Sequence, residues 1–208
     1  NQQQVAEVAA RLRALAPTHI IIAARGSSNN AARYAQYLFG AYNRLPVTLT
    51  TPSLFTLYQR APRMTDALVI GISQSGRSPD IVAVIEEARR QGCPTLAITN
   101  APDAPLAAAA EHTLELQAGE EHSVAATKTY TAQLLALALL SAHWAEDATR
   151  LAALAQLPAA MEATLALTQP IAALAERYTY ATEAVVLGRG FNYTTAFEIA
   201  LKLKELTY

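Results

Sequence analysis

The chain has 208 residues, of which 52% are apolar and 16% are charged, and its formal net charge is −1. This composition supports a buried core and excludes a disordered chain, and the near-neutral charge argues against a nucleic-acid partner, which needs a basic face. The single cysteine excludes an intramolecular disulfide and a cysteine-rich metal site, and the longest apolar stretch, residues 134–142, is too short to span a bilayer.

Apolar runs alternate with helical patterns along the first 145 residues. Residues 20–24 and 67–72 are continuous apolar runs, which are typical of parallel strands covered on both faces. The predicted strands are residues 20–24, 47–51, 67–72, 94–99 and 113–116. The predicted helices are residues 4–16, 30–45, 53–58, 79–91 and 123–145.

Strands that alternate with helices predict βαβ units, right-handed crossovers and a parallel sheet. Five strands with helices on both faces fit an α/β, flavodoxin-like fold of three αβα layers, with strand order 2-1-3-4-5. In that order the first and third strands are neighbours, and the crevice at their carboxyl ends is the expected ligand site. We therefore expect the polar loops at residues 25–28 and 73–78 to meet there.

The residues after this fold predict connecting helices and a new strand. Residues 147–178 are rich in Ala and Leu and carry no strand pattern. Pro158 and Pro170 interrupt them, which predicts two connecting helices. Residues 184–187 then predict a strand, and residues 194–208 a helix.

Two segments, residues 21–28 and 185–192, resemble each other. Each has an apolar run, an Arg-Gly pair and small polar residues before a helical stretch. A strand that ends in such a loop and enters a helix is typical of ligand binding. Its repetition predicts two copies of one domain, of which the second is expected to be incomplete at Tyr208. The expected division is a first domain at residues 1–146, linker helices at 147–182, and a truncated second domain at 183–208.

The loop at residues 73–78, Ser-Gln-Ser-Gly-Arg-Ser, places three hydroxyls, an amide and a glycine before a helix that starts at Pro79. Unpaired N–H groups at a helix N-terminus attract anions, and hydroxyls there can donate to phosphate oxygens. Gly76 lets the backbone approach closely. The loop thus fits a phosphate monoester, although plain serine capping explains it equally well. Residues 26–30, Gly-Ser-Ser-Asn-Asn, allow the same two explanations.

Two further polar clusters lie later in the chain. Residues 120–128 open the long helix, and acidic residues there suit the helix dipole. His122 has no partner His or Cys at ligand spacing, so no metal site is expected. Glu198, Lys202 and Glu205 share one helical face, which fits either an exposed ladder of salt bridges or acid–base chemistry.

Four motifs together resemble the sugar isomerase (SIS) domain superfamily. They are Arg-Gly-Ser-Ser at 25–28, Ser-Gln-Ser-Gly at 73–76, Ser-Val-Ala-Ala-Thr-Lys at 123–128, and Glu-x-x-x-Lys-Leu-Lys-Glu at 198–205. They occur in order over nearly the whole chain. More closely they are similar to the isomerase half of the glutamine–fructose-6-phosphate aminotransferases and to stand-alone relatives that deaminate or isomerise amino-sugar phosphates.

The resemblance implies a substrate site and a catalytic pair. The serine-rich segments would hold the sugar phosphate and nearby hydroxyls through Gly26, Ser27, Ser28, Ser73, Gln74, Ser75, Gly76 and Ser78. Val124 and Ala126 would line the sugar pocket. Glu205 would be the base that moves a proton between C1 and C2, and Lys202 would assist ring opening or enolisation. No cofactor or metal is implied.

These roles imply an enzyme that acts on a phosphorylated hexose or amino sugar. We expect it to be cytoplasmic and a homodimer, with no nucleic-acid or membrane partner. If the protein also lacks a glutamine-hydrolysing domain, the expected reaction converts glucosamine 6-phosphate to fructose 6-phosphate and ammonia. Two alternatives stay open: the isomerase part of an aminotransferase, and a non-catalytic sugar-phosphate sensor, which would have no need for Glu205 and Lys202.

The chain departs from the aminotransferase pattern at four positions. Ala126 stands where those proteins usually have serine, which removes a hydroxyl from the sugar pocket. Ser27 and Ser78 stand in place of threonine, and Arg25 replaces a common cysteine, which favours the stand-alone relatives. In the family the second domain also adds a histidine from across a dimer interface and a C-terminal lysine, and this chain contains neither.

Overall fold

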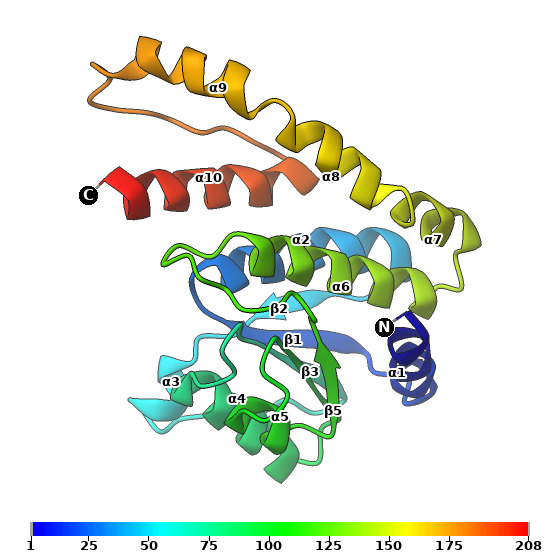
Figure 1. The fold of residues 1–208 in the computed structure, drawn as a ribbon. Helices are drawn as coiled ribbons and strands as arrows, with labels where there is room; N and C mark the ends of the chain where they lie inside the picture. The colour runs from blue at the N-terminus through cyan, green and yellow to red at the C-terminus, as the bar shows by residue number, and fades with distance from the viewer. Residues whose placement is uncertain (1, 208) are drawn as a thin grey trace.

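The computed structural model describes residues 2–207 and contains a parallel sheet with helices on both faces (Figure 1). The strands are β1 (His19–Ala24), β2 (Val47–Leu49), β3 (Ala67–Ile72), β4 (Thr95–Thr99) and β5 (His112–Glu115). They form one five-stranded sheet in the order β2-β1-β3-β4-β5, and every neighbouring pair is parallel. The predicted fold class and strand order are confirmed.

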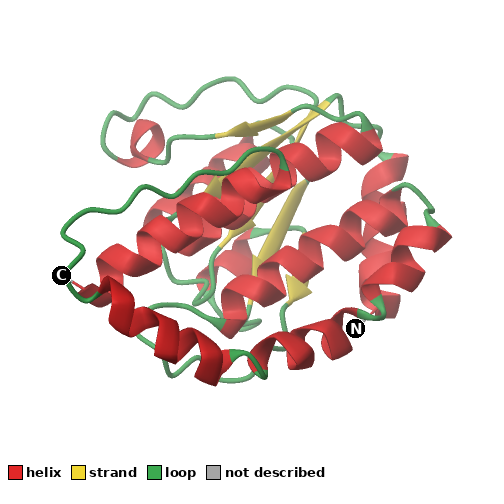
Figure 2. Cartoon of the chain, turned by 90° about the horizontal axis from the view of Figure 1, so that it is seen from above, coloured by secondary structure: helices red, strands yellow, loops and turns green. Residues whose placement is uncertain are grey.

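Each face of the sheet has its own helical layer. One layer contains α1 (Gln2–Ala14), α2 (Gly26–Asn43) and α6 (Lys128–Trp144). The other contains α3 (Ser53–Thr56), α4 (Pro79–Arg90) and α5 (Pro105–Ala109). Figure 2 shows long helices covering the sheet, with the strands visible in the gaps between the helices.

The two layers are separated because side chains alternate along each strand. In β1, Ile20 and Ile22 pack with α1, α2 and α6, whereas Ile21 and Ala23 pack on the α4 side. β3 is buried at every position. This explains the unbroken apolar runs in the sequence, since a strand covered on both faces has no position for a polar side chain.

Two helix starts differ from the prediction, and one short helix was not predicted. α2 begins at Gly26 and not at residue 30, because Ser28 and Asn30 are buried and tertiary contacts outweigh their weak helix propensity. α6 begins at Lys128 and not at residue 123. α5 has only five residues, too few to give a periodic apolar pattern.

The connecting region contains three α-helices and not two. They are α7 (Ala148–Leu154), α8 (Leu157–Leu165) and α9 (Thr168–Ala175), followed by a 3-10 turn, Glu176–Tyr178. Pro158 and Pro170 each lie in the first turn of a helix, where the missing N–H costs nothing. The prediction was two helices interrupted by these prolines. In the structure the prolines lie at the beginnings of α8 and α9, so three shorter helices form.

The strand predicted at residues 184–187 does not form. Val185 and Leu187 are 84% and 87% exposed, and within residues 2–207 no strand pairs with this segment. An apolar run becomes a strand only when a neighbour accepts and donates its hydrogen bonds. The chain instead runs from the 3-10 turn to α10 (Phe191–Thr207), which lies over α2 (Figure 1).

A helix that crosses a bilayer needs about 20 consecutive, mainly apolar residues. Taken singly, none of the helices within residues 2–207 is long and apolar enough. One bent pair, Ala148–Leu165 with Thr168–Tyr178, meets both criteria only when its two parts are counted together, across a bend of 46°.

Candidate functional site

The carboxyl ends of β1 and β3 bring two polar segments together. The strands pair in register, so that Ala24 lies beside Ile72 and the chain leaves both strands at the same edge. The guanidinium of Arg25 then contacts Asp80, with Nε 2.6 Å and Nη2 2.5 Å from Oδ2. This ion pair joins the residue before α2 to the first turn of α4. The predicted meeting of the two segments is confirmed.

The segment after β1 is the first turn of α2 and not a loop. Arg25 occupies the N-cap position, and no side chain in residues 2–207 caps the helix. The N–H of Asn29 donates to the Arg25 carbonyl at 3.2 Å, whereas the N–H groups of Gly26, Ser27 and Ser28 find no acceptor in the described chain. Three free N–H groups with the positive end of the helix dipole form a site suited to an anion.

In the loop between β3 and α4, Ser73 Oγ lies 3.4 Å from Ser78 Oγ, and backbone N–H groups donate to Ser73 and Ser75. Ser73 Oγ accepts from the N–H of Gly76 at 3.2 Å, and Ser75 Oγ accepts from the N–H of Arg77 at 3.3 Å. Ser78 is the N-cap of α4, but its side chain makes no capping bond to any described residue. Serine side chains therefore cap neither α2 nor α4, contrary to the capping explanation of these segments.

The tight turn of this loop depends on Gly76, whose φ is +62°. A Cβ atom there would lie 2.6 Å from the Cβ of Ala104 and 3.0 Å from Thr99 Oγ1. Next to it, the Gln74 carbonyl accepts from Thr99 Oγ1 at 3.3 Å and from the N–H of Asn100 at 3.1 Å. The end of β4 thus fixes the backbone of the loop while the Gln74 amide stays half-exposed.

The face of α10 that carries Glu198, Lys202 and Glu205 lies against α2. Lys202 Nζ is 2.8 Å from Glu205 Oε2 and 3.4 Å from Glu198 Oε1. Glu198 is only 7% exposed, and its Oε2 accepts from Asn30 Nδ2 at 2.8 Å. A fully exposed ladder of salt bridges is therefore excluded, because its first member is buried. Asn30 follows the first turn of α2, so Lys202 and Glu205 lie on a helix held next to that turn.

The third predicted cluster is an irregular segment before α6 that Glu121 holds in place. Burial acts to raise the pKa of Glu121, but hydrogen bonds from the N–H and hydroxyl groups of Thr127 and Thr129 outweigh it and lower the pKa to about 2. Val124 is exposed and Ala126 is half-buried. Val124 and Ala126 thus lie on a segment that the Glu121 hydrogen bonds hold in place. Within residues 2–207, Val124 does not lie in a closed pocket.

The structure adds polar residues that the sequence analysis did not assign to the site. Gln133 of α6 is 2% exposed, and its Nε2 donates to Ser28 Oγ at 3.0 Å. Tyr130, one turn earlier, is also buried, and burial together with the Glu198 carboxylate raises its pKa. In the sequence, Asn30 and Gln133 are recognisable only as polar residues within apolar helical stretches. That pattern does not indicate which residue each one contacts.

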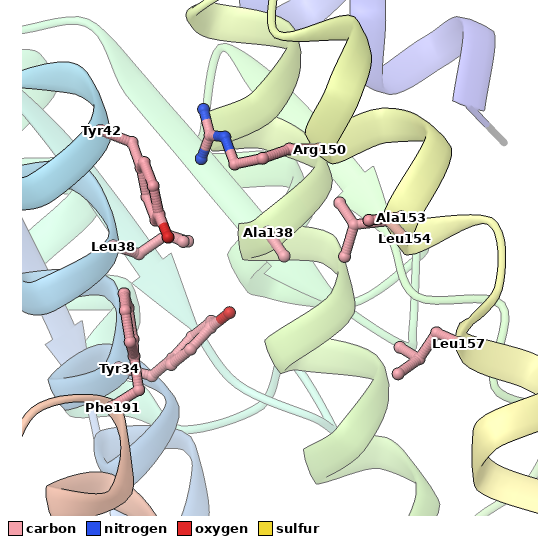
Figure 3. A pocket seen from close by; sticks show the side chains of 9 residues that line it. All are labelled: Tyr34, Leu38, Tyr42, Ala138, Arg150, Ala153, Leu154, Leu157 and Phe191. Atoms are coloured by element: carbon pink, nitrogen blue, oxygen red, sulfur yellow. The ribbon is translucent and has the colours of Figure 1, made fainter.

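A hollow of about 340 Å³ lies between α2, α6, α7, α8 and the start of α10 (Figure 3). Its lining is mainly apolar and aromatic, and it includes none of the predicted site residues. Its one cation, Arg150, pairs with Asp147 at 2.8 Å and lies over the Tyr42 ring at 4.0 Å. The hollow thus offers a phosphate one paired cation, whereas the edge of β1 and β3 offers the free N–H groups at the start of α2.

The chain is similar to known proteins in both sequence and fold. Residues 16–142 match the sequence model of the SIS domain. The isomerizing glutamine–fructose-6-phosphate aminotransferase of Gloeobacter violaceus is 38% identical over 199 residues, which cover 91% of this chain and 32% of that protein. The chain therefore spans about a third of the length of the curated relatives that it matches.

Two solved structures share the fold over nearly the whole chain. A protein of Silicibacter pomeroyi, provisionally named a phosphosugar isomerase, is 40% identical with a TM-score of 0.92, over 98% of this chain and 62% of that one. The C-terminal domain of glucosamine-fructose-6-phosphate aminotransferase from Francisella tularensis is 27% identical with a TM-score of 0.86, over 100% and 65%. The strand order, the two serine-rich segments and the match over residues 16–142 lead to one conclusion: the chain belongs to the SIS domain family.

Proposed function

We propose that this chain binds a phosphorylated hexose or amino sugar at the carboxyl edge of β1 and β3. The observation that supports this most directly is the pair of helix N-termini there. Neither α2 nor α4 has a side-chain cap among the described residues, although serines surround both. The phosphate would take the free N–H groups of Gly26, Ser27 and Ser28 and the hydroxyls of the serine-rich loop, Ser73, Ser75 and Ser78, with Gln74 beside them.

The reaction that we propose is the deamination of glucosamine 6-phosphate by way of an isomerisation. In the open-chain sugar, Glu205 removes the C2 proton while O1 takes up a proton, which gives an enolamine, and Glu205 then returns its proton to C1. The C1 aldehyde thus becomes a hydroxymethyl group, and the C2 amine becomes an imine as its nitrogen releases one proton, which balances the proton taken up by O1. Water then hydrolyses the imine to fructose 6-phosphate and ammonia. Lys202, 2.8 Å from Glu205, would stabilise the negative charge that develops on O1 during enolisation.

The isomerase part of an aminotransferase is the second candidate. The 38% identity to such an enzyme over 91% of this chain favours it. Both reactions need the same phosphate site and the same proton transfer, and they differ in the source and fate of the nitrogen.

We also propose the division into residues 1–146, 147–182 and 183–208, in which Lys202 and Glu205 come from outside the residues that match the SIS domain.

Ammonia release from glucosamine 6-phosphate separates these functions. The intact protein is incubated with that sugar alone, and in parallel with fructose 6-phosphate and glutamine. Ammonia with fructose 6-phosphate in the first reaction supports the deaminase. Glucosamine 6-phosphate made only in the second supports the aminotransferase. Binding of fructose 6-phosphate without turnover in either reaction would leave the sensor and contradict both enzymes.

The Glu205→Gln variant tests the proposed base. We expect its kcat to fall by about 10²-fold or more, because an amide cannot accept the C2 proton, while the Kd for fructose 6-phosphate changes little. Turnover and calorimetric binding are measured on the same preparation. Glu162→Gln on α8, a carboxylate remote from the site, is the matched control and should keep both values. Full turnover in Glu205→Gln would remove Glu205 from the mechanism.

A further inference from the structure

Gln133 is a buried amide whose hydrogen bonds are only partly satisfied. It lies on α6 among leucines and alanines and is 2% exposed. Its Nε2 donates to Ser28 Oγ at 3.0 Å, but its Oε1 is buried without a partner among the described residues. A buried polar group without a partner costs free energy of folding, so an apolar side chain would suit this core position better. The amide therefore calls for a role other than packing.

That role follows from what the bond does to Ser28. A hydroxyl has one proton to donate and lone pairs that accept. Because Gln133 donates to Ser28 Oγ, the Ser28 proton is directed to some other acceptor. Within the described chain Ser28 does not cap α2, and its own N–H is also free. Ser28 thus presents two donors at the N-terminus of α2, one from the backbone and one from the side chain.

We propose that Gln133 is a positioning residue for the sugar-phosphate site. By donating to Ser28 Oγ it orients the Ser28 hydroxyl so that its proton points to an oxygen of the bound sugar phosphate. This inference rests on the proposed function, because it needs that ligand at the edge of β1 and β3. It assigns to α6, a helix that supplies no group to the phosphate itself, a share in ligand affinity through one hydrogen bond.

A double-mutant cycle tests this role, with fructose 6-phosphate as the probe in isothermal titration calorimetry. Gln133→Met removes the amide and keeps an unbranched side chain of similar size. We expect it to weaken binding by about fivefold to tenfold in the wild-type background and by less than about twofold in a Ser28→Ala background. The melting temperature should stay the same or rise, because the unpartnered oxygen is lost. Gln133→Leu replaces Gln133→Met if the latter does not fold.

The control is Ser141→Ala, which removes another polar contact between α6 and α2. Ser141 Oγ lies 2.5 Å from Asn43 Oδ1, at the end of α2 opposite Ser28. We expect it to lower the melting temperature and leave the Kd unchanged. Equal losses of affinity for Gln133→Met in both backgrounds, or no loss in either, would overturn the positioning role. Failure of the wild-type chain to bind fructose 6-phosphate would instead overturn the proposed function, and this inference with it.

Discussion

Individual hydroxyl and carboxylate groups decide what the candidate site can bind. The oxygens of Ser73 and Ser75 accept hydrogen bonds from the backbone, and Ser73 Oγ also lies 3.4 Å from Ser78 Oγ. One proton is shared within the Ser73–Ser78 pair, which leaves the other proton of that pair and the Ser75 proton for a ligand. Glu121 shows the opposite behaviour, since its carboxylate accepts four hydrogen bonds from Thr127 and Thr129. The serine hydroxyls can therefore serve ligand binding, whereas the Glu121 carboxylate serves the stability of the segment before α6.

The Glu121 contacts predict a pH-dependent stability. Its pKa falls from 4.5 to about 2 in the folded chain, so its contribution is complete above pH 4.5 and is lost as the pH falls toward 2. Glu121→Gln should lower the melting temperature above pH 4.5, and its difference from the wild-type chain should shrink between pH 4.5 and pH 2. Glu120→Gln, which loses a carboxylate that bonds to neither threonine, should show no such trend. A difference independent of pH would contradict this account.

At the scale of elements, α10 is held on α2 by a polar contact and by aromatic packing. Asn30 donates to the buried Glu198 carboxylate at one end of the contact. At the other end, Phe191 lies 5.7 Å from Tyr34 and 6.1 Å from Tyr42 between ring centroids. Because Lys202 also contacts Glu198, the polar end of this contact determines where the proposed catalytic pair lies.

Removing the Asn30 amide should therefore loosen α10. Asn30→Leu leaves the buried Glu198 Oε2 without its donor, and we expect the free energy of unfolding to fall by about 1–3 kcal/mol. Urea denaturation measures the change. Asn29→Leu is the matched control, since the Asn29 side chain makes no hydrogen bond to a described residue, and it should change stability by about 0.5 kcal/mol or less. Equal effects of the two substitutions would show that the Asn30–Glu198 bond does not hold α10.

The elements that were predicted correctly are those set by local pattern. The apolar runs of β1 and β3 and the Pro79 start of α4 are visible in the sequence, and they are enough to place two serine-rich segments at one edge. The contact between Asn30 and Glu198 joins residues 168 positions apart, and no local pattern indicates it. The run at 184–187 has strand-forming residues, but a strand also needs a neighbour, which a single segment does not reveal.

At the scale of the whole chain, two parts of the molecule meet at the candidate site. The proposed phosphate-binding groups belong to the sheet and its two serine-rich segments, within the residues that match the SIS domain. Lys202 and Glu205 lie on α10, which the chain reaches after three connecting helices that lead away from the sheet and an irregular segment, residues 179–190, that leads back (Figure 1). Ligand binding and proton transfer can therefore be tested separately in this chain, because each depends on its own set of residues.

The central claim is that the serine-rich edge of β1 and β3 binds the phosphate of a sugar, and Ser78 tests it most directly. Its hydroxyl caps nothing in the described chain and has one long contact, 3.4 Å to Ser73 Oγ, so Ser78→Ala should change the melting temperature little. Calorimetric titration should show that fructose 6-phosphate binds the wild-type chain, that fructose does not, and that Ser78→Ala binds fructose 6-phosphate about fivefold to tenfold more weakly. Equal affinity for fructose and its 6-phosphate, or an unchanged Kd in Ser78→Ala, would contradict the claim.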